Sequence, residues 1–83
     1  MSAIATKLRK LREIYGYPQD YVAYQMGISQ AAYSKKETGK TELSLTVLEQ
    51  IAGLYQISMV DLIGLSLSDL LIMAVQKTAN VNA

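Results

Sequence analysis

The chain has 83 residues and a net charge of +1, and it contains neither cysteine nor histidine. This length allows one domain with one modest core. The missing residue types exclude disulfides and thiolate metal sites, argue against zinc, and remove the usual general base of enzymes. No apolar run approaches the roughly 18 residues of a membrane span. We therefore expect a cytoplasmic protein with no cofactor, no metal and no membrane contact, and not an enzyme.

The small net charge hides a basic half and an acidic half. Residues 1–40 contain seven basic and three acidic side chains, whereas residues 41–83 contain one lysine and four acids. This change of sign suggests that the first half faces an anion. An ordinary solvated surface with uneven charge is the alternative.

Apolar residues recur at helical spacing from Ile4 to Tyr15 and predict a first helix that stops at Gly16. The polar side of this helix carries Lys7, Arg9, Lys10 and Arg12.

The stretch from Pro18 to Lys40 predicts two short helices joined at Gly27. Glycine suits the left-handed residue that ends a helix, and Ser29 is a good N-cap for the next one. Ile28 and Tyr33 occupy positions at which a hydrophobic staple fixes the angle between the two helices. The solvent side of the second helix carries small, polar or basic residues, a surface that suits a DNA groove. These residues are Gln30, Ala31, Ser34 and Lys35.

Glu37 has the wrong charge for its position. A carboxylate in the last turn of a helix opposes the helix dipole, so its presence predicts a basic partner, which the first helix could supply. An exposed glutamate at a small energetic cost is the alternative.

Three further helices are predicted beyond the polar loop of residues 38–42. Ser44 caps a fourth helix whose apolar spacing continues to Tyr55, and Ser58 caps a short fifth helix that ends at Gly64. Ser66 starts a sixth helix that is apolar on nearly every side.

The sixth helix must bury its apolar surface somewhere. We expect a bundle over residues 1–64, this helix over residues 65–77 and a flexible tail over residues 78–83. The helix could fold back over its own core or pair with a second subunit. The second case makes it a dimerisation element, with interface residues Leu67, Leu70, Leu71, Met73 and Ala74.

From Leu8 to Ile63 the chain resembles the helix-turn-helix domains of the phage repressor and Cro type, also called the XRE family. The residues that carry the resemblance are Arg12, Gln19, Val22, Ala23, Met26, Gly27, Ile28, Ser29, Gln30, Tyr33, Ser34, Lys35, Glu37, Gly39, Lys40, Ile51, Ala52, Ile57, Ser58, Asp61, Leu62 and Ile63. The resemblance implies an all-α fold: a compact five-helix repressor-like bundle, here with an added C-terminal helix. It also implies a sequence-specific DNA-binding transcriptional regulator, a repressor that binds double-stranded DNA as a homodimer on a palindromic site.

The resemblance also implies roles for single residues. Glu37 is expected to pair with Arg12. The residues expected to read base edges are Gln30, Ala31, Ser34 and Lys35. Those expected to contact phosphates are Gln19, Ser29, Thr38, Lys40 and Thr41.

Lys36 departs from the family pattern, which has an apolar residue at this position. Its stem could lie along apolar surface, the helix could fray early, or the ammonium group could add a phosphate contact.

A different class of function remains open. The apolar C-terminal segment could bind a partner protein, as in an antitoxin or a helical protein-interaction module.

Overall fold

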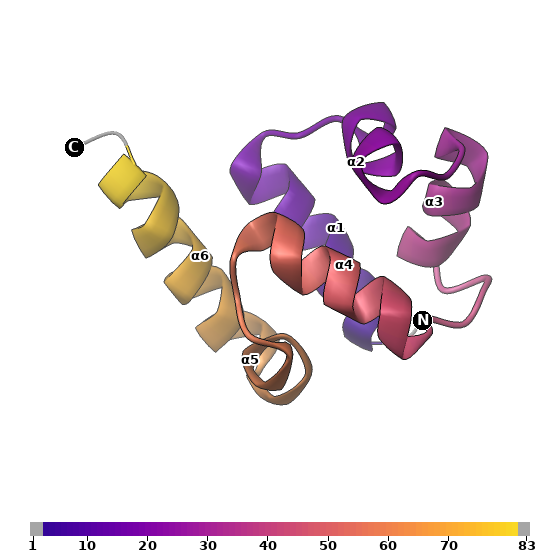
Figure 1. The fold of residues 1–83 in the computed structure, drawn as a ribbon. Helices are drawn as coiled ribbons and strands as arrows, with labels where there is room; N and C mark the ends of the chain where they lie inside the picture. Colours follow the sequence, from indigo (N-terminus) through magenta and orange to yellow (C-terminus); the bar gives the residue numbers. More distant parts are fainter. Residues whose placement is uncertain (1–2, 82–83) are drawn as a thin grey trace.

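Six helices make up the computed structural model, which describes residues 3–81 (Figure 1). They are α1 (Ala3–Tyr15), α2 (Gln19–Met26), α3 (Gln30–Glu37), α4 (Leu45–Tyr55), α5 (Met59–Gly64) and α6 (Leu67–Val81). The described range contains no strand, so the predicted all-α fold is confirmed.

Four of the helices begin at a serine. The hydroxyl oxygen of the serine accepts a hydrogen bond from the backbone N–H three residues further on, at 3.0–3.2 Å. Such a cap satisfies one of the donors that the first turn of a helix leaves unpaired. The capping residues are Ser29, Ser44, Ser58 and Ser66, all as predicted.

The core is one cluster of apolar residues that all six helices contribute to. Its largest fully buried members are Tyr33, Tyr55, Leu8, Leu11, Ile51, Leu62, Leu70 and Val22. Helix α1 is central because it packs against α3, α5 and α6. The apolar face predicted for the first helix is therefore the surface on which the bundle is built.

Two lysines hold the C-terminal ends of other helices. The ammonium group of Lys7 in α1 is buried and donates to the carbonyl oxygens of Leu62 and Ile63 in α5, at 3.0 and 3.1 Å. Lys77 in α6 donates to the carbonyl oxygen of Gln56, the left-handed residue that ends α4. A cation at this end of a helix pairs with unsatisfied carbonyl groups and with the dipole.

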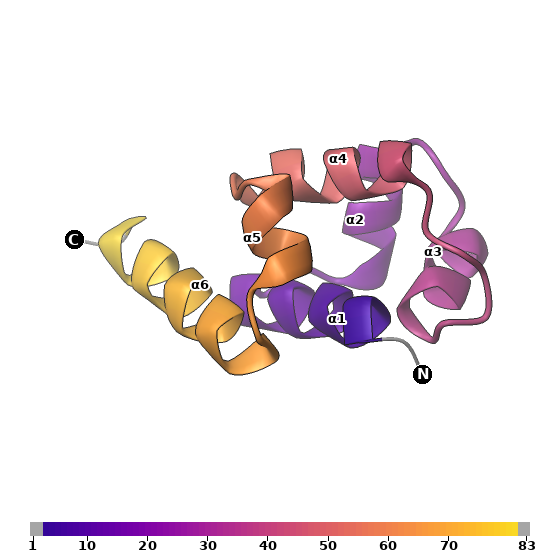
Figure 2. The same ribbon diagram turned by 90° about the horizontal axis from the view of Figure 1, so that it is seen from below.

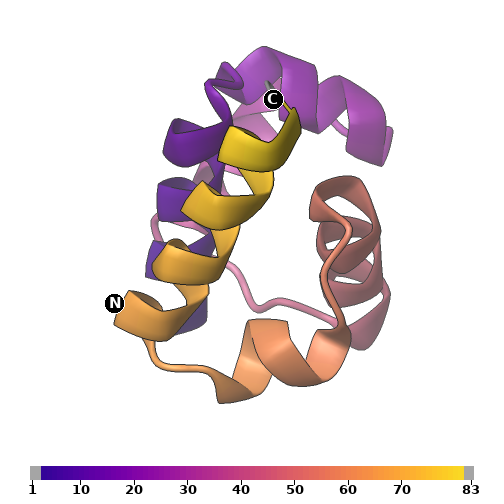
Figure 3. The ribbon, with the colours of Figure 1, turned by 90° about the vertical axis from the view of Figure 1, so that its left-hand side faces the viewer.

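Helix α6 lies along α1 at one end of the molecule, and α3 lies at the other end (Figures 1 and 2). Figure 3, seen from the side of α6, shows this helix in front of α1. The molecule measures 34 × 24 × 19 Å. Helices α3 and α6 are therefore separated by the rest of the bundle.

Helix α6 continues beyond the boundary predicted at Lys77. It reaches Val81, and the hydroxyl group of Thr78 donates to the carbonyl oxygen of Val75 at 2.9 Å. Residues 78–81 are thus helical. The last two residues of the predicted tail lie outside the described range.

Candidate nucleic-acid interface

A tight turn at Gly27 joins α2 and α3. Gly27 has a φ of 71°, its N–H donates to the carbonyl of Tyr24 at 3.1 Å, and the N–H of Ile28 donates to the carbonyl of Ala23 at 3.0 Å. These two bonds close α2, and Ser29 opens α3 immediately afterwards. Because a side chain at this φ is strained, glycine is favoured here.

Apolar side chains fix the angle between α2 and α3. Val22, Ala23 and Met26 of α2 are buried, as is Tyr33 of α3, and Ile28 packs against them in a half-buried position. The helix-turn-helix corner predicted from this stretch is present.

An ion pair joins this corner to α1. Arg12 Nε donates to Glu37 Oε2 at 2.5 Å, and Arg12 Nη2 donates to Glu37 Oε1 at 3.2 Å. Arg12 Nη1 donates to the carbonyl oxygen of Tyr17 at 3.0 Å. The basic partner that Glu37 required is therefore Arg12, in a bidentate arrangement that fixes both side chains.

Gln19 is a further member of this cluster. Its Nε2 donates to Glu37 Oε1 at 3.2 Å, so α1, α2 and α3 all meet at one carboxylate. Gln19 is predicted to contact a phosphate, and its bond to Glu37 uses one of its two amide hydrogens, which leaves the other for such a contact. The sequence did not indicate the bond to Glu37, because it depends on the burial of Glu37 beside α2, which follows from the fold.

Burial and the surrounding donors act in opposite directions on Glu37. Burial by itself raises the pKa of the carboxyl group, but the hydrogen bonds from Arg12 and Gln19 and the nearby Tyr33 hydroxyl outweigh it, so the pKa is lowered. The pKa of Tyr33 is raised, first by burial and then by the negative charge of Glu37. The cluster therefore holds Glu37 ionised at neutral pH.

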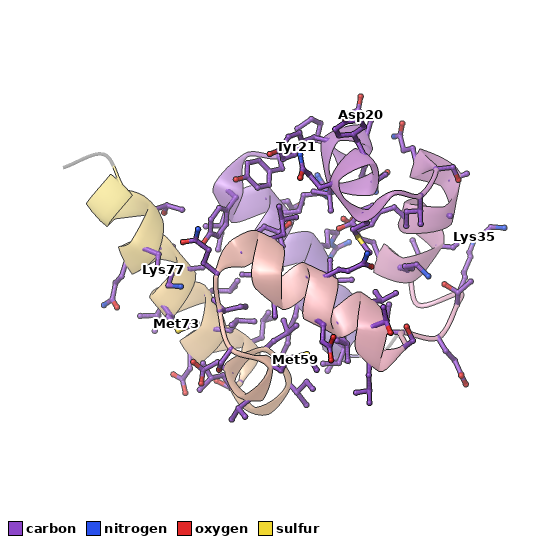
Figure 4. All side chains as sticks on the ribbon, in the orientation of Figure 1. Asp20, Tyr21, Lys35, Met59, Met73 and Lys77 are labelled. Atoms are coloured by element: carbon purple, nitrogen blue, oxygen red, sulfur yellow. The ribbon has the colours of Figure 1, made fainter. Side chains whose placement is uncertain are left out.

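The outer face of α3 carries the residues predicted to read bases. Gln30, Ala31 and Lys35 are exposed and Ser34 is half-buried. Lys35 projects from the side of α3 that points away from α6 (Figure 4). Helix α6 is marked in this view by Met73 and Lys77. Within residues 3–81, the side chains of Gln30 and Lys35 have no hydrogen-bond or ion-pair partner, so their polar groups are available to a ligand.

The residues predicted to contact phosphates differ in what they can donate. The hydroxyl oxygen of Ser29 accepts from Ala32, so its proton remains available. Lys40 and Thr41 are exposed beyond the end of α3. The hydroxyl of Thr38 instead donates to the carbonyls of Ser34 and Lys35, at 3.1 and 3.3 Å, and its N–H also donates to Ser34. Thr38 thus presents no free donor in this conformation.

Helix α3 does not fray at Lys36. It continues to Glu37 and is closed by Gly39 and Lys40, whose N–H groups donate to the carbonyls of Lys36 and Lys35 at 3.3 and 2.9 Å. Lys36 is half-buried, as expected for a lysine whose stem lies along apolar surface.

The basic surface is smaller than the sequence indicated. Lys7 is buried against α5, Arg12 is paired with Glu37, and Lys10 lies 3.5 Å from Glu13. Spacing alone put Lys7 on the polar side of α1, and no sequence signal distinguished it from its neighbours. The free positive charge lies mainly on α3 and the loop after it.

The predicted dimer residues are not all accessible. Leu70 and Ala74 are fully buried in the core of their own chain, which excludes them from an interface with a second subunit. Leu67, Leu71 and Met73 are half-buried. The more exposed apolar residues of α6 are Ile72 and Val75. The sequence could not separate these two faces because both are apolar.

The described residues contain neither a cluster of metal ligands nor a membrane-spanning helix. No group of three or more acidic side chains within residues 3–81 could hold a metal ion, and no helix in that range is long and apolar enough to cross a membrane.

The fold and this site are those of a helix-turn-helix DNA-binding protein. The corner turns at Gly27, its second helix α3 is capped and exposed, and a buried ion pair joins α3 to α1. The sequence model of the helix-turn-helix family matches residues 8–62, about two thirds of the chain, and the chain belongs to the XRE type of this family. It is a DNA-binding transcription regulator of that type. Comparisons with curated proteins and with solved structures found no match.

Proposed function

We propose that the protein is a sequence-specific repressor that inserts α3 into the major groove of double-stranded DNA. The observation that carries this proposal is the outer face of α3. Gln30, Ala31 and Lys35 are exposed there without internal polar partners, while the Arg12–Glu37 pair fixes the opposite face to α1. A rigidly held helix with free polar groups can position donors and acceptors against base edges.

The chemistry of the exposed residues suggests which bases they read. Glutamine at position 30 matches N6 and N7 of adenine, alanine at 31 contacts a thymine methyl group, and lysine at 35 donates to O6 and N7 of guanine. A good bidentate contact discriminates by about 1–3 kcal/mol. So short a set specifies only a few base pairs.

Phosphate contacts would hold α3 in register without reading sequence. Ser29, Lys40 and Thr41 have groups available for this purpose at the two ends of α3. Gln19 can donate to a phosphate through the amide hydrogen that Glu37 does not take, or by leaving Glu37. Thr38 must first break its bonds to α3.

We further propose a homodimer on a palindromic site, with an interface other than the one expected from the sequence. A palindrome requires both recognition helices to face the same duplex. The twofold axis of a symmetric interface lies within that interface. Because α6 and α3 lie at opposite ends of the molecule, a dimer formed through α6 places its two α3 helices at its far ends, pointing away from each other. Pairing through α5, at the lower edge in Figure 1, allows both to face one duplex. Val60 and Ile63 of α5 are 78% and 46% exposed and offer an apolar contact there.

Selection of bound sequences from a random DNA pool tests this function. We expect an enriched site with two inverted half-sites about one helical turn apart. Failure to enrich any sequence would refute sequence-specific reading, and enrichment of a single half-site would refute the palindromic dimer. A reporter gene with the enriched site at its promoter then distinguishes repression, which lowers transcription, from activation.

A further inference from the structure

The outward face of α6 carries a stripe of small and apolar residues. Ile72 and Val75 are 57% and 52% exposed, although they lie in the middle of the helix. Ser68 and Ala79 are also exposed and lie one turn before and one turn after them. The four residues are spaced by four, three and four positions, which is the spacing of the contact seam between two paired helices. We call them the α6 stripe.

The opposite face of the same helix is already occupied. Leu70 and Ala74 are fully buried against the core, and Lys77 is bonded to Gln56. Helix α6 is therefore fixed in one rotational position, and the stripe cannot turn inward to bury itself.

We propose that the α6 stripe pairs with the same stripe of a second copy, with the two helices antiparallel. This pairing sets Ile72 against Val75 of the second copy, and Ser68 against Ala79, around one twofold axis. The β-branched residues meet at the centre, and the small residues at both ends let the helices approach closely.

The charge pattern favours the antiparallel orientation of the two copies over the parallel one. Asp69 is the charged residue that flanks the stripe, and Lys77 is bonded to its own chain. Parallel pairing would set Asp69 beside its own counterpart, whereas antiparallel pairing separates the two by about 13 Å along the helix axis. That distance exceeds the Debye length of about 8–10 Å under ordinary salt conditions, and antiparallel helix dipoles also attract.

Such pairing has a functional consequence that rests on the proposed DNA binding. Because α6 and α3 lie at opposite ends of the molecule, the two recognition helices of this pair point away from each other. The pair cannot bind both halves of one palindrome, but it can hold two separate duplex segments. Since α5 remains free, α6 pairing would join two operator-bound dimers.

The contact is small. Helix α6 is about 22 Å long, and a single helix face offers less than the about 800 Å² per partner of a standard protein interface. We therefore expect weak pairing in free solution. Pairing is strengthened where DNA holds two molecules near each other.

Cysteine cross-linking tests the pairing without DNA, because the natural chain contains no cysteine. Ser68→Cys protein mixed with Ala79→Cys protein under mild oxidation should form a mixed disulfide dimer. Each variant alone should form little, because antiparallel pairing keeps like positions about 16 Å apart along the axis, beyond the reach of a disulfide. Thr46 is exposed on α4, away from the stripe, so Thr46→Cys protein mixed with Ala79→Cys protein gives the disulfide yield from random collision. A mixed yield no greater than this control would overturn the pairing, and efficient self-linking of Ser68→Cys would overturn the antiparallel orientation.

A capture assay then tests the joining of duplexes. One short duplex is fixed to beads, and a second, labelled duplex of the same mixed sequence is added with the protein at low ionic strength. The double variant Ile72→Ser, Val75→Ser leaves the net charge unchanged and should bind single duplexes as the natural protein does. It should capture the labelled duplex about tenfold less or worse, because the apolar contact at the centre of the stripe is lost. Equal capture by both proteins would overturn the inference. Absence of binding to single duplexes by the natural protein would refute the proposed function instead, and the cross-linking result would be unaffected.

Discussion

Removal of the Arg12 side chain should destabilise the protein far more than removal of a neighbouring basic side chain. Arg12 and Glu37 have side chains only 15% and 2% exposed. The change Arg12→Ala leaves the buried carboxylate with Gln19 as its main donor. Breaking a buried pair in this way costs about 3–5 kcal/mol, and because Gln19 remains we expect about 3 kcal/mol.

Lys10→Ala is the matched control on the same helix. Lys10 lies 3.5 Å from Glu13, and both side chains are more than 40% exposed. An exposed pair of this kind contributes at most about 1 kcal/mol. For a domain of this size, the Arg12→Ala variant should melt more than about 10 °C below the natural protein, and Lys10→Ala within about 8 °C of it.

The destabilisation by Arg12→Ala should also depend on pH. In the natural protein the pKa of Glu37 is lowered despite its burial, so the stabilisation is present at neutral pH and is lost as pH falls through the lowered value. In the variant, burial is largely uncompensated and should raise the pKa of Glu37. Its destabilising charge is then removed by protonation as pH falls. The difference in stability between the two proteins should therefore shrink from pH 7 towards about pH 4.

Urea unfolding followed by circular dichroism measures both effects. Equal losses in Arg12→Ala and Lys10→Ala at pH 7 would refute the energetic role of the pair. A stability difference that stays constant between pH 7 and about pH 4 would refute the assigned role of Glu37 ionisation.

Three further predictions separate the roles of exposed and buried residues. Lys7→Met should lower the free energy of unfolding by about 1–3 kcal/mol, because two carbonyl oxygens of α5 lose their donor, and DNA affinity measured below the unfolding transition should not change. Lys35→Ala should reduce discrimination at one base position by about 1–3 kcal/mol. Lys40→Ala should instead weaken binding to all sequences and reduce the slope of log binding constant against log salt concentration by about one. Fluorescence anisotropy on matched and mismatched duplexes distinguishes these outcomes. Leu70→Ala should cost about 2–5 kcal/mol in urea unfolding and Val75→Ala less than Leu70→Ala; the reverse order would contradict the packing of α6 on its own core.

The sequence determined the local features of this protein. The serine caps, the glycine turn at Gly27 and the apolar spacing of each helix depend on residues within one or two turns of one another, so they could be predicted without knowledge of the fold. The same holds for the composition of the exposed face of α3. The helices observed begin and end within a few residues of the predicted boundaries, except for α6.

The tertiary structure decided what each charged or apolar side chain faces. Lys7 and Lys10 are both basic residues of α1, yet one is buried against the end of α5 and the other lies near the surface beside Glu13. Leu70 and Val75 are both apolar residues of α6, yet one is in the core and the other is exposed. These differences depend on contacts between residues up to 56 positions apart. No local pattern contains them, because the partner that buries a side chain is supplied by another helix.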